Sequence, residues 1–245
     1  MSTYSEASTR RLPRGWAHLV LQLAIWIGFY AVYQVARGAA DQSVSRAFAN
    51  GEWIIELQRS LNSMIELPLQ HLVESSSLLI QATSYTYWLS QFAVVGFALL
   101  SVYFRAHERF IRFRNTLIVA NLIGLVGYVT VPTAPPRMFP QAGFNDTLAD
   151  HAALTHNSSF VQFSANPYAA MPSLHSADAL IVGIVMALVV RSRWAKTLWL
   201  AWPPWVWFSV MATGNHFWLD IAAGVAVAGV AAALVYRPWR SPRAA

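Results

Sequence analysis

The segment with the clearest capacity for chemistry is residues 166–176, which leads directly into an apolar run. Pro172 suits the first turn of a helix, because the N–H that proline lacks would have no partner there. The free backbone N–H groups of such a helix would lie at residues 173–175 and carry partial positive charge. The hydroxyl of Ser173 and the imidazole of His175 complete a site that suits phosphate. The alternative is an ordinary membrane helix with an interfacial histidine.

A second polar pair, His216 and Asp220, stands at the start of another long apolar run. Residues four apart lie on one face of a helix, so the sequence predicts that these two side chains meet. The carboxylate would then fix the tautomer of the imidazole and stabilise its protonated form. Charge at membrane depth is costly unless it is paired, and paired charge there is usually functional. We therefore interpret the pair as part of a reactive site, with a structural pair that pins a helix end as the alternative.

The composition indicates an integral membrane protein. Of the 245 residues, 56% are hydrophobic and 11% are charged. Several apolar runs are long enough to cross a hydrocarbon core of about 30 Å. There is no Cys, which excludes disulfides and thiolate metal sites. The formal net charge of +6 does not indicate nucleic acid, because the basic residues fall in short clusters beside apolar runs.

The apolar runs predict an all-α protein: a six-span transmembrane helical bundle with interfacial amphipathic helices. The predicted spans are residues 16–36, 78–104, 115–131, 171–190, 198–213 and 216–236. A cleaved signal peptide is the alternative for the first run, although its apolar core is longer than such peptides have. Residues 41–77 are too polar to span and predict one or two interfacial helices, interrupted near Gly51 and Pro68.

These elements divide the chain into four parts. They are a tail (1–15), the first span with the interfacial helices (16–77), a catalytic helical bundle (78–236) and a second tail (237–245). Within the bundle, a loop of nearly 40 residues (133–170) joins the third and fourth predicted spans. A loop this long in a compact bundle is usually functional, and this one leads from Arg137 to Ser173. We expect His151 and His156, which it also contains, to be solvated.

The basic residues predict the orientation of the bundle. Six spans put both termini on one side, and all but four of the 17 Lys and Arg residues then fall on that side, including a predicted basic loop at 105–114. The positive-inside rule makes that side cytoplasmic. Arg137, His175 and His216 would meet at the opposite face. We therefore expect a protein of a bacterial cell membrane with both termini in the cytoplasm and the site on the extracytoplasmic face.

The polar residues resemble the motifs of a known family. The motif Pro-Ser-x-His-Ser is present as Pro172, Ser173, His175 and Ser176. The motif Ser-Arg-x5-His-x3-Asp is matched by Ser209, His216 and Asp220, with Val210 in place of its Arg. In order and spacing, roughly residues 70–236 resemble the type 2 phosphatidic acid phosphatase (PAP2) superfamily of membrane phosphatases.

The family's first motif, Lys-x6-Arg-Pro, survives only as Arg137. Thr130 stands in place of its Lys and Met138 in place of its Pro. Together with Val210, these differences remove two of the cations that bind phosphate in the family. The sequence Thr-Ala-Pro-Pro-Arg that ends at Arg137 looks like the form of this motif in the branch of inositol phosphorylceramide synthases.

The resemblance implies metal-independent phosphoryl transfer from a lipid-linked phosphate. His216 would attack phosphorus to give a phosphohistidine, Asp220 would orient it, and His175 would protonate the leaving alcohol and later activate water or an acceptor hydroxyl. The phosphate oxygens would be bound by Arg137, Ser173, the backbone N–H groups near Leu174, and Asn215. No cofactor and no metal are expected. Asp178, one turn after His175, is expected to pair within the bundle.

Three functions follow from these expectations. The first is a lipid phosphatase, the second a head-group transferase that uses an alcohol such as an inositol phosphate transferase, and the third a non-catalytic lipid carrier. Intact His175, His216 and Asp220 count against the carrier. A zinc site is disfavoured because these residues match no standard zinc spacing. The expected partners are a lipid phosphate or phospholipid substrate and the membrane lipids, and the sequence carries no signal of oligomeric state.

Overall fold

The computed structural model describes residues 13–39, 43–147 and 166–237. Their regular structure is helical, apart from an isolated parallel bridge between Thr133 and Ala169. The helices are α1 (Gly15–Gly38), α2 (Val44–Ser60), α3 (Glu66–Glu74), α4 (Ser77–Leu89), α5 (Val95–Arg105), α6 (His107–Thr130), α9 (Leu174–Val189), α10 (Arg193–Ala212) and α11 (Trp218–Tyr236). A π-helical turn, η1 (Ser90–Val94), joins α4 to α5, and two 3-10 turns, η2 (Pro136–Met138) and η3 (Pro140–Ala142), follow α6. The predicted all-α class is confirmed.

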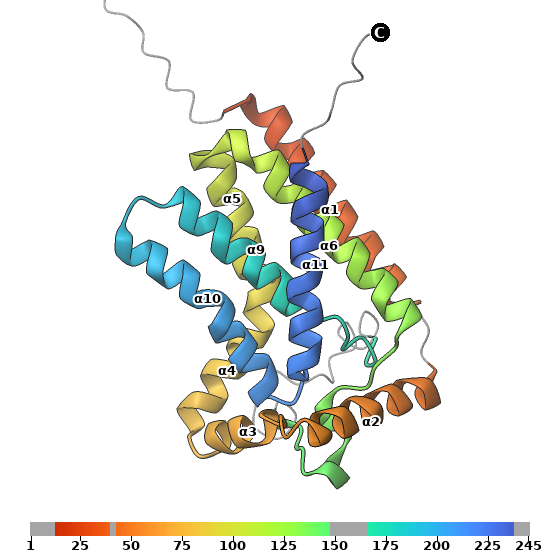
Figure 1. Cartoon of the computed structure of the whole chain (residues 1–245). Helices are drawn as coiled ribbons and strands as arrows, with labels where there is room; N and C mark the ends of the chain where they lie inside the picture. The colour runs from red at the N-terminus through yellow and green to blue at the C-terminus, as the bar shows by residue number, and fades with distance from the viewer. Residues whose placement is uncertain (1–12, 40–42, 148–165, 238–245) are drawn as a thin grey trace, which may run out of the picture.

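Four stretches of the described residues are long and apolar enough to cross a membrane. They are Gly15–Gly38, Ser77–Arg105, His107–Thr130 and Trp218–Tyr236. Helix α9 is apolar but has 16 residues, and α10 lies antiparallel beside it in the bundle (Figure 1). The predicted count of six spans therefore stays a prediction. The outer surface carries exposed apolar side chains such as Ile27, Val126 and Leu188, as a lipid-facing surface requires.

The bundle has two different ends (Figure 1). At one end lie the beginning of α1, the junction of α5 and α6, and the end of α11. Helices α2 and α3 lie across the other end, next to the beginning of α11. Helix α9 packs between α6, α10 and α11, so its first turn also lies near that second end. The interfacial helices and the candidate site are thus at the same end of the molecule.

Helices α2 and α3 lie in the segment where the sequence predicts interfacial helices, but the predicted interruptions at Gly51 and Pro68 are wrong. Gly51 lies inside α2 and is buried. It packs so closely against the ring of Phe139 that a Cβ at this position would collide with it. Pro68 lies in the first turn of α3, where a missing N–H costs little. The actual break is at residues 61–65, where Asn62 adopts a φ of 50°.

The predicted basic loop at 105–114 is also wrong. Helix α6 begins at His107, so Arg109, Arg112 and Arg114 lie on the helix and not before it. Likewise α10 begins at Arg193, five residues before the predicted span. Both differences have one cause: hydropathy marks where the hydrocarbon begins, whereas backbone hydrogen bonds continue a helix into the polar interface.

Candidate active site

The two ends of the long loop are held together beside the start of α9. The N–H of Thr133 donates to the carbonyl of Tyr168 over 2.7 Å, and the N–H of Ala170 donates to the carbonyl of Thr133 over 3.3 Å. The N–H of Ser173 then donates to the carbonyl of Asp220 over 2.9 Å. These bonds fix the segment before α9 against the end of α6 and the first turn of α11.

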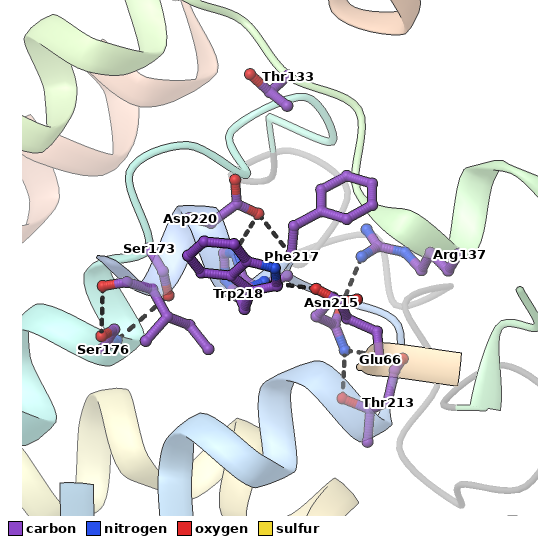
Figure 2. A network of polar contacts seen from close by, with 12 residues as sticks. Glu66, Thr133, Arg137, Ser173, Ser176, Thr213, Asn215, Phe217, Trp218 and Asp220 are labelled. Carbon is purple, nitrogen blue, oxygen red and sulfur yellow. Dashed lines mark hydrogen bonds and ion pairs between the residues drawn. The ribbon is translucent and has the colours of Figure 1, made fainter. Parts of the chain in front are cut away.

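Ser173 is the N-cap of α9. Its hydroxyl accepts a 3.3 Å hydrogen bond from the N–H of Ser176, whose own hydroxyl donates to the carbonyl of Ile221 over 3.2 Å (Figure 2). The helix therefore begins at Leu174, two residues after the predicted start at Pro172, because a serine side chain can satisfy the first free N–H groups. Ser173 is fully buried, and its hydroxyl hydrogen is free to point away from the helix.

Close contact between α9 and α11 depends on Gly224. A Cβ at this position would overlap the carbonyl of Ser173 and approach the side chain of Ser176. Only glycine lets the two helices come this near. The first turns of α9 and α11, which carry the predicted catalytic residues, are consequently held side by side.

The side chains of His216 and Asp220 meet, as predicted, but not along a helix. His216 precedes Phe217, the N-cap of α11, and Asp220 is in the first turn. Asp220 Oδ2 accepts a 2.8 Å hydrogen bond from the N–H of Phe217 and lies 3.4 Å from Nδ1 of His216. Both side chains are buried. The carboxylate thus caps its own helix and faces the imidazole at the same time.

His175 brings a second imidazole to this place from α9. The ring centroids of His175 and His216 are 5.7 Å apart. The ring of Tyr87, from α4, stacks on His175 with a centroid distance of 4.6 Å and an interplanar angle of 22°. His175 is half-buried, whereas His216 is 5% exposed. The two rings are tilted by 57° to one another, with His175 on α9 and His216 in the turn before α11, and His175 is the more exposed of the two.

Arg137 and Asn215 lie beside this histidine pair. Nη1 of Arg137 donates to Oδ1 of Asn215 over 2.6 Å (Figure 2). Its Nε lies 3.6 Å from Oδ2 of Asp146. The amide of Asn215 in turn donates to Oγ1 of Thr213 over 2.8 Å. Asn215 therefore orients the guanidinium with one end of its amide and uses the other within its own turn.

Burial, and after it the positive charge of Arg137, lower the pKa of His216 below the ordinary value of an imidazole. A neutral imidazole keeps a lone pair on one ring nitrogen. His216 is thus held in the form that can act as a nucleophile.

Leu174, whose N–H is predicted to bind phosphate, is the first residue of α9 and is buried. Its N–H is thus one of the groups that have no acceptor within the helix. Asp178 pairs within the bundle, as expected: Asn121 donates to both of its carboxylate oxygens, over 3.1 and 3.2 Å, and Gln91 donates to Oδ2 over 2.7 Å.

Glu66 is a residue of this site that the sequence interpretation missed. It lies in the segment 41–77, which the sequence predicts to be interfacial because of its polar residues, yet it is completely buried. Its Oε1 accepts hydrogen bonds from Nε2 of Gln58 over 2.8 Å and from the N–H of Trp218, the first residue of α11, over 2.7 Å (Figure 2). The neighbours of Glu66 in the sequence, Ile65 and Leu67, are apolar, which is the only local signal of its burial.

Two predictions about ligands remain open. The loop histidines His151 and His156 lie outside the described residues. Within the ranges that the structure describes, no group of three or more His, Asp or Glu side chains is arranged to hold a metal ion.

Comparison with known proteins gives a family. The model of the PAP2 superfamily matches residues 52–234, which include all the predicted catalytic residues. A phosphoinositol dihydroceramide synthase of Bacteroides thetaiotaomicron is 27% identical over 143 residues, a match that covers 53% of this chain and 47% of the relative. The match thus spans about half the length of that relative, and no solved structure gives a significant match. The name of this relative agrees with the synthase-like form of the first motif. Because the family model covers most of the chain, the protein belongs to the PAP2 superfamily, as its motifs predict.

Proposed function

We propose that the protein is a membrane enzyme that transfers a phosphoryl group from a phospholipid to an alcohol through a phosphohistidine at His216. One arrangement carries the proposal: the rings of His175 and His216 lie 5.7 Å apart, and Asp220 lies against Nδ1 of His216. The reaction needs a nucleophile, a group that orients it and an acid for the leaving oxygen. These three residues have the chemistry for those three tasks.

The first step would form the phosphoenzyme. Because Nδ1 of His216 faces Asp220, the nitrogen that attacks phosphorus is Nε2. The bond from phosphorus to the lipid alcohol breaks, and His175, which takes up a proton when the negative phosphate binds beside it, gives that proton to the oxygen. Asp220 stabilises the positive charge that develops on the His216 ring, as a carboxylate does for the imidazolium of a catalytic triad.

The second step would release the product. The acceptor hydroxyl gives its proton to His175 and attacks phosphorus, so that the P–N bond breaks and the neutral ring of His216 is restored. Arg137, held by Asn215, would donate to a phosphate oxygen in both steps. The hydroxyl of Ser173 at the start of α9 is a second donor to the same group.

An alcohol is a better acceptor than water for this site. A phosphate monoester carries up to about two negative charges near neutral pH. The motifs here supply Arg137, but Thr130 and Val210 stand where the family has further cations. A phosphodiester carries one negative charge and needs fewer cations. The name of the Bacteroides relative, a synthase of phosphoinositol dihydroceramide, also favours a transferase over a phosphatase.

The direct test follows a phosphorus label from the donor lipid to the product. The purified protein would be incubated in lipid nanodiscs with phosphatidylinositol labelled at phosphorus and with dihydroceramide as acceptor, and in parallel with labelled phosphatidic acid. We expect the label to move from phosphatidylinositol to a new lipid. Release of free phosphate from phosphatidic acid without any such transfer would support the phosphatase instead, and no reaction of either donor would contradict an enzymatic role.

A further inference from the structure

Arg37 is a charged residue near the site that none of the family's motifs contains. It lies in the last turn of α1, on a candidate membrane span. Its Cζ lies 5.7 Å from the centroid of the Tyr128 ring on α6. Its Nε is buried and, among the described residues, has no hydrogen-bond partner. A cation at this depth is costly and in most membrane proteins serves a function.

The surroundings of Arg37 are aromatic and not acidic. The ring of Tyr128, from α6, lies over its guanidinium, and Tyr33, one turn before Arg37 on α1, is buried. In the part of the chain that the structure describes, no Asp or Glu forms an ion pair with it. Tyrosine rings stabilise a guanidinium through their faces without neutralising it. Among the described residues, the charge of Arg37 is thus unpaired and its Nε has no acceptor, so that it can donate to an anion.

The position of Arg37 relates it to the segment that carries the first catalytic histidine. The ring of Tyr128 that lies over its guanidinium follows Gly127 on α6, and a Cβ at Gly127 would collide with Cδ of Pro172. Pro172 stands three residues before His175, so Arg37 lies near the start of α9. Arg137 reaches His216 from the loop after α6, so the two arginines come to the histidines from separate elements of the fold.

We propose that Arg37 is a second phosphate-binding residue of the active site. It would donate to one non-bridging oxygen of the substrate phosphodiester while Arg137 donates to the other. The inference rests on the proposed phosphoryl transfer. It also gives a reason why the cations of the family motifs are dispensable here: α1, which lies outside residues 52–234 of the family match, supplies a replacement.

The two arginines would act on charge that grows during the reaction. As Nε2 of His216 approaches phosphorus, negative charge accumulates on the two non-bridging oxygens. A fixed guanidinium that donates to such an oxygen is worth roughly 10²- to 10³-fold in rate, as single donors to developing oxyanions are. Because the ring of Tyr128 lies over the guanidinium of Arg37, it restricts the orientation of the planar N–H groups before substrate binds.

The test uses the full chain in nanodiscs and the phosphatidylinositol transfer assay, with Arg37→Gln, Arg37→Lys and Arg37→Ala. Arg59→Gln is the matched control, since Arg59 is an exposed arginine on α2 at the same end of the bundle. We expect Arg37→Gln and Arg37→Ala to lose about 10²- to 10³-fold in kcat/KM. Arg37→Lys should lose much of this as well, because an ammonium does not reproduce the fork. Arg59→Gln should behave as the unmodified protein.

Two further readouts separate phosphate binding from a structural role. Free guanidinium should restore part of the turnover of Arg37→Ala. Orthovanadate should inhibit Arg37→Lys more weakly than it inhibits the unmodified protein, while the melting temperatures of these two proteins stay similar. Full activity in Arg37→Gln, or a loss that guanidinium leaves unchanged together with unaltered orthovanadate inhibition, would overturn the assignment. An unmodified protein without transferase activity would overturn the proposed function itself, which makes the two failures distinguishable.

Discussion

Oε1 of Glu66 accepts a 2.7 Å hydrogen bond from the backbone N–H of Trp218, across 152 residues of sequence. Trp218 begins α11 and follows His216 by two residues. A carboxylate at a helix N-terminus satisfies a free N–H group and complements the partial positive charge there. Helix α3 thereby fixes the turn that carries His216.

This contact predicts that one substitution of Glu66 lowers stability and activity and that another leaves both nearly unchanged. In Glu66→Ala the N–H of Trp218 and the amide of Gln58 lose their acceptor, which costs about 1–3 kcal/mol per buried group. We expect a lower melting temperature and a lower kcat. Glu66→Gln keeps an oxygen at the same place and should stay close to the unmodified protein in both. The control is Glu56→Gln, an exposed glutamate on α2.

Equal stability and activity of Glu66→Ala and the unmodified protein would mean that this contact does not position His216.

The same residue predicts a pH dependence. Burial raises the pKa of Glu66 above its ordinary value, although the hydrogen bonds from Trp218 and Gln58 oppose this. The folded protein therefore binds this proton more readily than the unfolded chain does. The contribution of Glu66 to the free energy of unfolding is therefore full at pH values below its pKa in the unfolded chain. It is lost as the pH rises through its pKa in the folded protein. Relative to Glu66→Gln, the unmodified protein should become less stable with rising pH, as thermal unfolding at a series of pH values would measure. A difference between the two that is constant across pH would contradict the raised pKa.

The sequence was sufficient for the helical class and for the residues that gather at the site. Long apolar runs identify membrane helices because the hydrocarbon core tolerates little else. Ser173 and His175 were identified at a predicted helix start that suits phosphate, and His216 and Asp220 as a pair at a depth where unpaired charge is costly. Helix ends were predicted less well, since hydropathy reports the membrane and not the backbone.

Other features depend on contacts that local sequence does not contain. Asp220 reaches His216 through a capping turn, although the spacing suggested a helix. The burial of Glu66 depends on Trp218, far away in the chain. Arg37 was counted only as a basic residue of the outer face. In each case the environment is formed by a distant segment, which neither periodicity nor motif spacing reveals.

Arg137 predicts a loss of activity on a conservative change. Its Nη1 contacts Asn215 while its Nε faces Asp146, so the planar guanidinium is fixed in one orientation. Arg137→Lys keeps the charge but lacks this fork, and we expect a decrease in kcat/KM of about 10²-fold, the loss of one charge-assisted hydrogen bond of roughly 3 kcal/mol. Arg105→Lys, at an exposed position at the other end of the bundle, is the control. Near-full activity of Arg137→Lys would show that the guanidinium does not bind phosphate.

The orientation of the protein is open to chemical labelling. The chain has no Cys, so a single introduced thiol reports without background. Gln141 is exposed in η3 at the end of the bundle that carries the site, and Ser192 is exposed between α9 and α10. With the site on the extracytoplasmic face, Gln141→Cys should react with an impermeant maleimide in intact cells, and Ser192→Cys only after lysis. The reverse pattern would place the site in the cytoplasm.

Substitutions of His216 and of His175 should reduce activity in different ways. Without His216 no covalent phosphoenzyme can form, whatever the leaving group. Without His175 the nucleophile remains, and a substrate whose leaving group needs no proton should still react. The absence of a general acid costs roughly 10²- to 10⁴-fold on a poor leaving group. Asp220→Asn, with its imidazole present but wrongly oriented, should lie between the two.

The most direct measurement of the central claim is therefore a burst experiment with a natural phospholipid and with an activated aryl phosphodiester, on His216→Ala and His175→Ala. The account predicts that His216→Ala is inactive on both and forms no acid-labile phosphoenzyme. His175→Ala should be nearly inactive on the phospholipid but should give a burst of aryl alcohol matched by trapped phosphoenzyme. A phosphoenzyme in His216→Ala, or equal inactivity of His175→Ala on both substrates, would contradict it.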